Sequence, residues 1–500
     1  MSDSVPTLSQ WIAGGEAAGS PDGYGDVTNP ATGKVTARVP LGSAADAEAA
    51  IAAAKAAFPA WRKTSLAKRS RVLFRFRELL DARSGELAEI ITSEHGKVLS
   101  DAAGEVARGL EVVEFACGIP QLLKGAATAN ASTDIDVTSL REPLGPVAII
   151  SPFNFPAMVP MWFFPIAIAA GNTVVLKPSE KVPTAANWIA ELWREAGLPE
   201  GVFNVLHGNK TAVDALLHSP DIEAVSFVGS TPIAQYVYET GTANGKRVQA
   251  LGGAKNHMVV LPDADLDLVA DQAVSAGFGS AGERCMAVSV VVAVGDVADA
   301  LVPRIADRAK TLVTGDGTRS CDMGPLVTAA AKDRVSGYIA AGAEAGATLV
   351  LDGREGEFDA DGEGFFVGPT VFDHVRRDMP IYTDEIFGPV LSVVRVETFA
   401  DAIELINAGP YGNGAAIFTN DGGAARRFSA DVEAGMVGVN VPVPVPVAYH
   451  SFGGRKNSLF GDTHAHGGEG VHFFTRAKVV TTRWPGAGQG GLDLGFPQNV

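Results

Sequence analysis

The sequence predicts an α/β protein with more than one domain, and three observations lead to this prediction. The chain has 500 residues, more than one hydrophobic core usually organises. Apolar residues make up 46% of it and charged residues 19%, as in a globular chain with large cores. Short apolar runs alternate with helical patterns over residues 145–251 and again over about 253–450, which indicates two α/β blocks.

Residues 43–120 precede the first block and are predicted to be helical, with amphipathic patterns over 43–57, 66–81 and 101–117. In the last of these stretches Arg108 is the only arginine, three residues from both Glu105 and Glu111. This spacing by itself favours a solvated ion-pair face. A function for Arg108 therefore needs further support.

The first block is predicted to form a parallel sheet, and ligands bind such sheets at the carboxyl ends of the strands. Lys177 and Glu180 follow one strand and are placed to bracket ribose hydroxyls. Gly229 and Ser230 follow another and offer backbone amides to a pyrophosphate. The full GxGxxG pattern is absent, so a plain tight turn is the default interpretation there. The predicted strands are 146–151, 172–177, 202–206, 224–228 and 246–251.

Residues 145–176 carry no formal charge and could be mistaken for a membrane span. Prolines such as Pro156 and Pro165 interrupt them, which favours buried strands and turns instead.

The second block is predicted to alternate strands (288–294, 391–396, 415–419) with helices (297–313, 329–345, 399–408). Within it, Glu385 and Phe387 place an acid beside an aromatic residue in a loop, for which a surface turn is the default interpretation. Two further β-like segments, 132–140 and 471–483, lie at the edges of domain-sized blocks. They cannot bury both faces there, so strand pairing in an oligomer is expected.

Cys285 is the candidate nucleophile among the three cysteines. Glycine and other small residues precede it and leave room for a substrate, and the guanidinium of Arg284 is expected to lower the pKa of the thiol. Cys117, in an apolar helical run, and Cys321, in a turn-like segment, fit the alternative of a small hydrophobic residue.

Net charge and cysteine usage limit the partners and the compartment. A net charge of −17 argues against non-specific binding to nucleic acid or to an anionic membrane. Three cysteines without paired spacing indicate a reducing compartment. Residues 1–4 show no basic flank before an apolar core, so a cytoplasmic location is expected. No metal site is predicted.

Six motifs occur along the chain: PFNFP at 152–156, KPSE at 177–180, FVGS at 227–230, LGGAK at 251–255, GSAGERC at 279–285 and EIFGP at 385–389. In this order they resemble the aldehyde dehydrogenase superfamily over essentially the whole chain.

Four further details are GAKNH at 253–257, RCMA at 284–287, VPVPVP at 441–446, and Ser451-Phe452 leading to SLFGD at 458–462. They resemble the CoA-acylating methylmalonate-semialdehyde dehydrogenase branch, and the last two are specific to it.

The resemblance implies a fold and a domain arrangement. The fold would combine a Rossmann-like NAD-binding domain, an α/β catalytic domain and a small β element for oligomerisation. The NAD-binding domain would comprise 1–123 and 143–252, the catalytic domain 253–455, and the oligomerisation strands 124–142 and 470–488. The assembly would be a homo-oligomer, either a dimer or a tetramer.

The resemblance also implies roles for single residues. Cys285 would add to the aldehyde carbon, and Asn154 with the Cys285 amide would donate to the oxyanion. Arg108 and Arg284 would bind a substrate carboxylate, for which a guanidinium fork is well suited. The NAD-binding residues would be Phe153, Lys177, Glu180, Gly229, Ser230, Glu385 and Phe387.

The implied reaction is NAD-dependent, with CoA as co-substrate. Methylmalonate or malonate semialdehyde would give propanoyl-CoA or acetyl-CoA with loss of the carboxylate carbon, in valine, pyrimidine or inositol breakdown. The alternatives are a hydrolytic semialdehyde dehydrogenase that makes a free acid and a catalytically silent member of the fold. The chain departs from the pattern at Leu251, where hydrolytic members carry glutamate and the branch asparagine, and at Glu283, where glutamine is common and an acid is expected to lie near Arg284 and Cys285.

Overall fold

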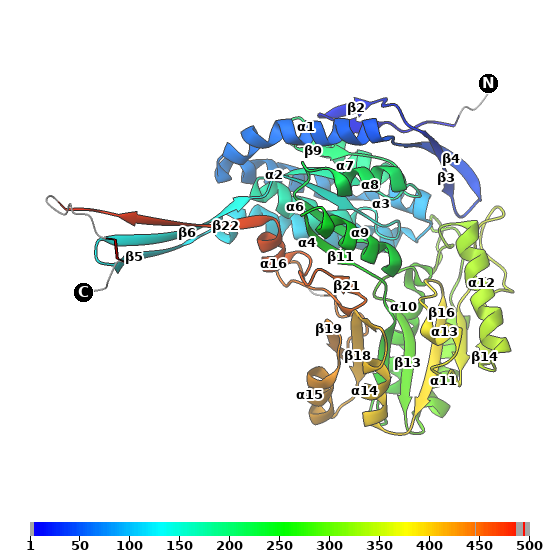
Figure 1. The fold of residues 1–500 in the computed structure, drawn as a ribbon. Helices are drawn as coiled ribbons and strands as arrows, with labels where there is room; N and C mark the ends of the chain where they lie inside the picture. The colour runs from blue at the N-terminus through cyan, green and yellow to red at the C-terminus, as the bar shows by residue number, and fades with distance from the viewer. Residues whose placement is uncertain (1–4, 446, 487–493, 496–500) are drawn as a thin grey trace.

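The computed structural model describes residues 5–445, 447–486 and 494–495. Its elements form two bodies, each built on one sheet, and a narrow arm that projects away from both (Figure 1). Residues 1–4 and the end of the segment 470–488 lie outside the described residues. The predicted α/β class is confirmed, whereas the domain boundaries stay predictions.

The first body contains an eight-stranded sheet in the order β2-β1-β9-β8-β7-β10-β11-β21. The five strands from β9 to β11 in this order are parallel, as their apolar runs predict, and antiparallel strands extend both edges. The bounds are β1 Gln10–Ile12, β2 Gly15–Ala17, β7 Pro146–Ile150, β8 Thr173–Lys177, β9 Phe203–Val205, β10 Ala224–Val228, β11 Arg247–Leu251 and β21 Leu459–Phe460.

Helices cover this sheet, and a hairpin of β3 (Gly23–Asn29) with β4 (Lys34–Leu41) lies beside them (Figure 1). The predicted helical region 43–120 is confirmed as five helices. The bounds are α1 Ala44–Lys63, α2 Leu66–Ala82, α3 Ser84–His95, α4 Leu99–Cys117, α5 Ile119–Leu122, α6 Met158–Ala170, α7 Thr184–Glu195, α8 Lys210–His218 and α9 Thr231–Ala243.

Helix α6 lies between β7 and β8, as the predicted alternation of strands and helices over 145–251 implies, although the prolines in 145–176 favoured buried strands and turns. All of its residues are buried, so it has no polar face, and its sequence shows no amphipathic pattern that would indicate a helix. It accommodates Pro165 in its interior, and its length is too short to span a bilayer. No helix in the described residues is long and apolar enough to cross a membrane.

The second body contains a seven-stranded sheet in the order β14-β15-β16-β13-β12-β18-β19, parallel except for β14. The strands are β12 Asn256–Val260, β13 Val288–Val294, β14 Thr348–Leu351, β15 Thr370–Asp373, β16 Val390–Val396, β18 Gly414–Phe418 and β19 Met436–Val439. The helices are α10 Leu266–Phe278, α11 Val297–Lys310, α12 Ala329–Glu344, α13 Pro380–Thr383, α14 Phe399–Asn407 and α15 Gly422–Asp431, and a short pair joins β17 Tyr411–Gly412 to β20 Arg455–Lys456.

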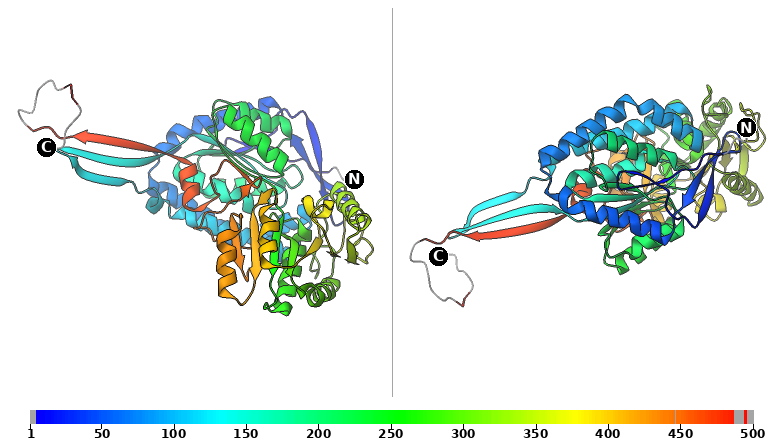
Figure 2. Two further views of the ribbon diagram at one scale, coloured as in Figure 1. Left: turned by 60° about the horizontal axis from the view of Figure 1, so that its bottom comes forward. Right: turned by 90° about the horizontal axis from the view of Figure 1, so that it is seen from above.

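The arm is a three-stranded antiparallel sheet in the order β22-β6-β5, and it stands clear of both bodies in every view (Figures 1 and 2). Its strands are β5 Ala126–Ser132, β6 Ile135–Pro143 and β22 Thr475–Arg483. The predicted β segment 471–483 is wrong at its start, because residues 471–473 complete helix α16 Gly467–Phe473. Pairing of this arm with a second copy stays a prediction.

The two sheets meet at opposite ends of their strands. Strand β11 ends at Leu251, and residues 252–255 lead directly into β12. The carboxyl edge of the first sheet therefore faces the amino edge of the second. Residues that follow β7, β8 and β10 meet residues that precede β12, β13 and β16.

Candidate active site

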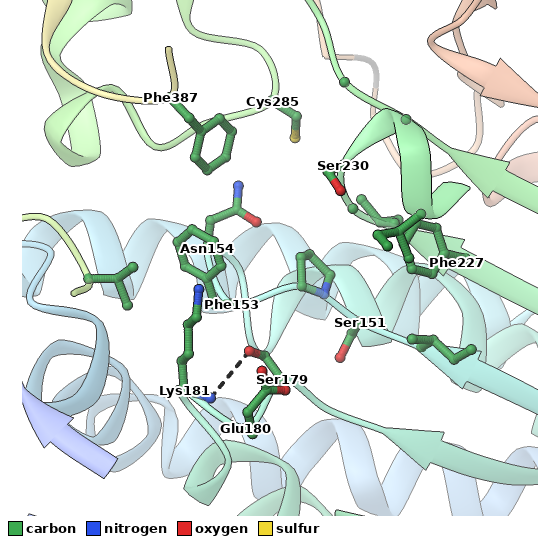
Figure 3. A pocket seen from close by; sticks show the side chains of 18 of the residues that line it. Ser151, Phe153, Asn154, Ser179, Glu180, Lys181, Phe227, Ser230, Cys285 and Phe387 are labelled. Atoms are coloured by element: carbon green, nitrogen blue, oxygen red, sulfur yellow. Dashed lines mark hydrogen bonds between the residues drawn. The ribbon is translucent and has the colours of Figure 1, made fainter. Parts of the chain in front are cut away.

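A cavity of about 950 Å³ lies where the two sheet edges face each other. Residues that follow strands of the first sheet and loops that precede strands of the second sheet both line it. Figure 3 shows the sulfur of Cys285 and the amide of Asn154 turned toward the same space, with Phe387 beside them. The predicted site residues in its lining are Phe153, Asn154, Lys177, Glu180, Gly229, Ser230, Cys285, Glu385 and Phe387; Arg108 and Arg284 are not part of it.

A tight turn presents Cys285 to this cavity. Helix α10 ends at Phe278, and Ser280, Ala281 and Gly282 then take left-handed backbone angles of φ 55°, 52° and 71°. A Cβ on Gly282 would lie 2.2 Å from the carbonyl oxygen of Gly388, so the turn requires glycine there. The carbonyl of Cys285 accepts from the Asn256 amide at 2.8 Å. The backbone of the cysteine is thus anchored while its thiol faces the cavity.

The Cys285 thiol is not activated by Arg284, contrary to the sequence-based expectation. Burial, and next the negative charge of Glu385, raise the pKa of Cys285 to about 11, although hydrogen bonds from backbone amides and from Asn154 oppose this. The Arg284 guanidinium instead binds Asp101 Oδ1 on α4 at 2.6 Å. The groups that lower the thiol pKa are therefore backbone amides and Asn154, not Arg284.

Asn154 lies in the turn between β7 and α6 and is 3% exposed. Its Nδ2 donates to the carbonyl oxygen of Glu283 at 2.9 Å and also lies within hydrogen-bonding reach of the Cys285 sulfur. An amide in this position can donate to an oxygen that develops on a carbon bonded to the sulfur.

The Glu283 carboxyl lies away from Cys285, which corrects the expectation of an acid beside the thiol. It is fully buried, with Oε2 3.8 Å from His95 Nε2 and Oε1 3.4 Å from the amide nitrogen of Val327. Burial raises the pKa of Glu283 to about 8, so the carboxyl is protonated at pH 7. A protonated carboxyl is neutral, as is the side-chain amide of the glutamine that is common at this position.

The opposite end of the cavity carries polar groups suited to a dinucleotide. Lys177 Nζ lies 3.2 Å from Glu180 Oε2, and burial lowers the pKa of Lys177. Ser230 directly precedes helix α9 at its N-cap position, and its side chain makes no capping hydrogen bond to the first amides of that helix. The Gly229 amide, however, donates to the Leu251 carbonyl at 3.1 Å. The Gly229 amide is therefore engaged within the fold.

The Glu385 loop closes the cavity from the second sheet. Glu385 Oε1 accepts from the Ala254 amide at 3.0 Å, and burial raises its pKa. Phe387 holds φ 55°, and its ring meets Phe153 edge to face at 5.8 Å. Lys255 donates to the carbonyl of Asp384 at 2.7 Å and so fixes the loop. The default surface-turn interpretation of this loop is wrong.

Two lysines near the site were not singled out from the sequence. Lys181 lines the cavity, and its Nζ lies 4.8 Å from the centre of the Phe153 ring. Its position directly after the KPSE motif was the available signal. Lys97 is fully buried and contacts the Asn154 carbonyl at 2.6 Å. No local pattern could connect residues this far apart in the chain.

Arg108 and Arg284 lie outside the cavity, on helix α4 and beside it. Arg108 binds Glu111 at 3.0 Å, not Glu105, and its Nη2 donates to the Val445 carbonyl at 3.4 Å. Val445 and Cys285 both pack against the same large apolar cluster, which extends through much of the first body. The structure therefore places neither arginine in the cavity: Arg108 binds Glu111 and the Val445 carbonyl, and Arg284 binds Asp101.

Leu251 is buried at the end of β11 and belongs to the apolar cluster against which Cys285 packs. The carboxylates in the lining of the cavity are those of Glu180 and Glu385. Position 251 therefore offers no group that could remove a proton from water.

Comparisons with known proteins agree with this geometry. Residues 18–480 match the model of the aldehyde dehydrogenase family. The malonate-semialdehyde dehydrogenase of Pseudomonas aeruginosa is 58% identical over 463 residues, which cover 92% of this chain and 93% of that protein.

Two crystal structures are similar over nearly their whole length. A methylmalonate-semialdehyde dehydrogenase from Oceanimonas doudoroffii is 54% identical with a TM-score of 0.95, covering 97% of this chain and 99% of that one. A Sinorhizobium meliloti protein assigned to the same activity, complexed with NAD, is 51% identical with a TM-score of 0.96, covering 98% of this chain and 100% of that one.

Proposed function

This chain belongs to the aldehyde dehydrogenase family, and we propose that it oxidises malonate semialdehyde or methylmalonate semialdehyde with NAD and transfers the acyl group to CoA. One observation carries the proposal: a single cavity joins a cysteine thiol and a buried amide donor to acidic groups suited to ribose hydroxyls. The products would be acetyl-CoA or propanoyl-CoA, CO₂ and NADH.

The residues of the cavity fit NAD. Lys177 and Glu180 would hold the adenosine ribose, Glu385 the nicotinamide ribose, and the first amides of α9 the pyrophosphate. A carboxylate beside the 2′-hydroxyl repels a 2′-phosphate, so NAD is favoured over NADP. When bound, NAD supplies the acceptor for the hydride.

The chain's own residues would carry out the carbonyl chemistry. Cys285 Sγ would add to the aldehyde carbon, and the thiol proton would leave to solvent. Asn154 Nδ2 would donate to the oxygen that becomes negative, and removal of such a donor typically lowers the rate about a hundredfold to a thousandfold. Loss of the hydride would leave a malonyl or methylmalonyl thioester on Cys285. The carboxylate of this thioester would leave as CO₂ and the α-carbon would take up a proton. CoA thiolate would then accept the acyl group and release the Cys285 thiolate.

Arg108 is the candidate for the substrate carboxylate because the resemblance implies this role, and its ion pair with Glu111 is partly exposed. Arg284 could join it only after it leaves Asp101. We therefore propose that Arg108 binds the substrate carboxylate and that Arg284 is the second residue of the pair that the resemblance implies.

The experiment measures NADH formation without CoA. A positioned base speeds attack of water about a hundredfold to ten-thousandfold, and Leu251 is not a base. We expect one burst of about one equivalent of NADH per site, then near arrest, and steady turnover once CoA is added. Leu251→Glu should divert product to free acid, whereas the matched variant Leu251→Gln should not.

A hydrolytic dehydrogenase is the alternative, and Glu385 is the observation in its favour. Glu385 lies in the same cavity, its charge acts on Cys285, and its pKa is raised. Steady NADH formation without CoA, with free acid as product, would establish that alternative and refute acyl transfer to CoA.

A further inference from the structure

We propose that the buried ion pair of Lys97 and Glu105 positions Asn154 for oxyanion binding, so that both are positioning residues of the reaction. The inference rests on the proposed role of Asn154. Neither residue lines the cavity, and Lys97 lies 57 residues from Asn154 in the chain.

Lys97 holds the backbone of Asn154 directly. It follows Gly96, which ends helix α3 in a left-handed conformation at φ 88°. Its Nζ donates to the Asn154 carbonyl at 2.6 Å and to Glu105 Oε2 at 2.8 Å, and it lies 4.2 Å from the centre of the Phe155 ring. The ammonium is thus surrounded by two acceptors and an aromatic face.

Glu105 holds the other end of the same turn. Its Oε1 accepts from the amides of Ala157 at 2.9 Å and Met158 at 3.1 Å, at the start of helix α6. Ala157, at the N-cap position of α6, has no side chain that could cap the helix. A carboxylate from α4 therefore accepts hydrogen bonds from amides that would otherwise lack partners. Its negative charge also interacts favourably with the positive, N-terminal end of the α6 dipole.

The two residues fix the turn at both ends. Asn154 is tied at its carbonyl, and the chain three and four residues later is tied at its amides. The amide of Asn154 then reaches the Glu283 carbonyl from a backbone with little freedom. Helix α4 also packs closely on α6, where a Cβ on Gly109 would lie 2.4 Å from Met161 Cε.

A fully buried ion pair is weak as a source of stability, because desolvation offsets the attraction between the charges. Apolar residues of similar volume would often fold as well. Its place in the wall behind Asn154 is therefore better explained by the geometry that it imposes than by the stability that it adds.

The test is a double-mutant cycle on the first turnover. We expect Lys97→Met to slow the first formation of NADH by roughly ten- to hundredfold, since small misplacements of a catalytic group have effects of this size. In an Asn154→Ala background, the same change should slow it no more than about threefold, because the group that it positions is gone. The dissociation constant for NAD, measured by fluorescence titration, should stay unchanged.

Two further variants separate positioning from folding. Lys97→Met with Glu105→Leu removes both charges; it should restore Tm toward the native value but not the first-turnover rate. Glu114 lies on α4, like Glu105, but forms an exposed ion pair with Arg77 of α2. Glu114→Gln breaks this exposed pair and should leave the rate unchanged.

The outcomes distinguish this inference from the proposed function. Equal slowing by Lys97→Met with and without Asn154, or full recovery of the rate in the double apolar variant, would overturn the positioning role. If Asn154→Ala itself leaves the rate intact, the oxyanion assignment fails, and this inference fails with it.

Discussion

Replacing Glu283 by glutamine should stabilise the protein in a pH-dependent way. The carboxyl is fully buried, and its partners are the Val327 amide at 3.4 Å and His95 Nε2 at 3.8 Å. Burial raises its pKa from 4.5 to about 8. Glutamine has nearly the same shape, is neutral at every pH and has an amide that can donate toward His95.

The magnitude follows from the pKa difference between the two states. The unfolded carboxyl loses its proton above pH 4.5, whereas the folded one keeps it up to about pH 8. Folding therefore takes up a proton between these values, and stability falls as pH rises. Each tenfold change in proton concentration contributes about 1.4 kcal/mol, which amounts to roughly 3 kcal/mol at pH 7. For 500 residues this corresponds to about 3 °C in Tm.

The assay compares Tm of the native protein and of Glu283→Gln by scanning fluorimetry between pH 5 and 8. The advantage of the variant should be small at pH 5 and grow by roughly 3 °C toward pH 8. Glu114→Gln, which removes an exposed carboxyl, is the matched control and should show no such growth. A Tm difference that does not change with pH, or a variant less stable at pH 8, would refute the assignment of a protonated buried carboxyl.

The remaining predictions concern substrate and thiol. Arg108→Leu should lower kcat/KM for malonate semialdehyde about tenfold or more relative to propanal, which has no carboxylate, because a charge-assisted contact is lost. Equal loss on both substrates would point to a folding role. The rate at which iodoacetamide alkylates Cys285 should rise about tenfold per pH unit between pH 7 and 9. The reason is that the thiol pKa is about 11, so the reactive thiolate fraction is still rising over this range. A plateau below pH 9, with Cys117→Ala and Cys321→Ala as background, would contradict this.

The strands that carry the site could be predicted because their signals are local. β10 and β13 have the bounds that their apolar runs predict, and β7 ends within one residue of its predicted end. Once these strands are parallel, the residues after them must lie along one edge. The sequence by itself therefore determined that Lys177, Glu180 and Ser230 would lie together, and the resemblance to the aldehyde dehydrogenase superfamily added Cys285 and Glu385.

The tertiary structure alone decided which charged groups face the site. Arg284 is adjacent to Cys285 in the chain, but Asp101, 183 residues away, holds its guanidinium. A helix was predicted between β7 and β8, but the bounds of α6 could not be, because every one of its residues is buried and polar spacing could not mark its period. Lys97, Glu105 and Asn154 meet only after α4 packs on α6. Such contacts depend on packing between distant segments, and a local pattern contains no information about it.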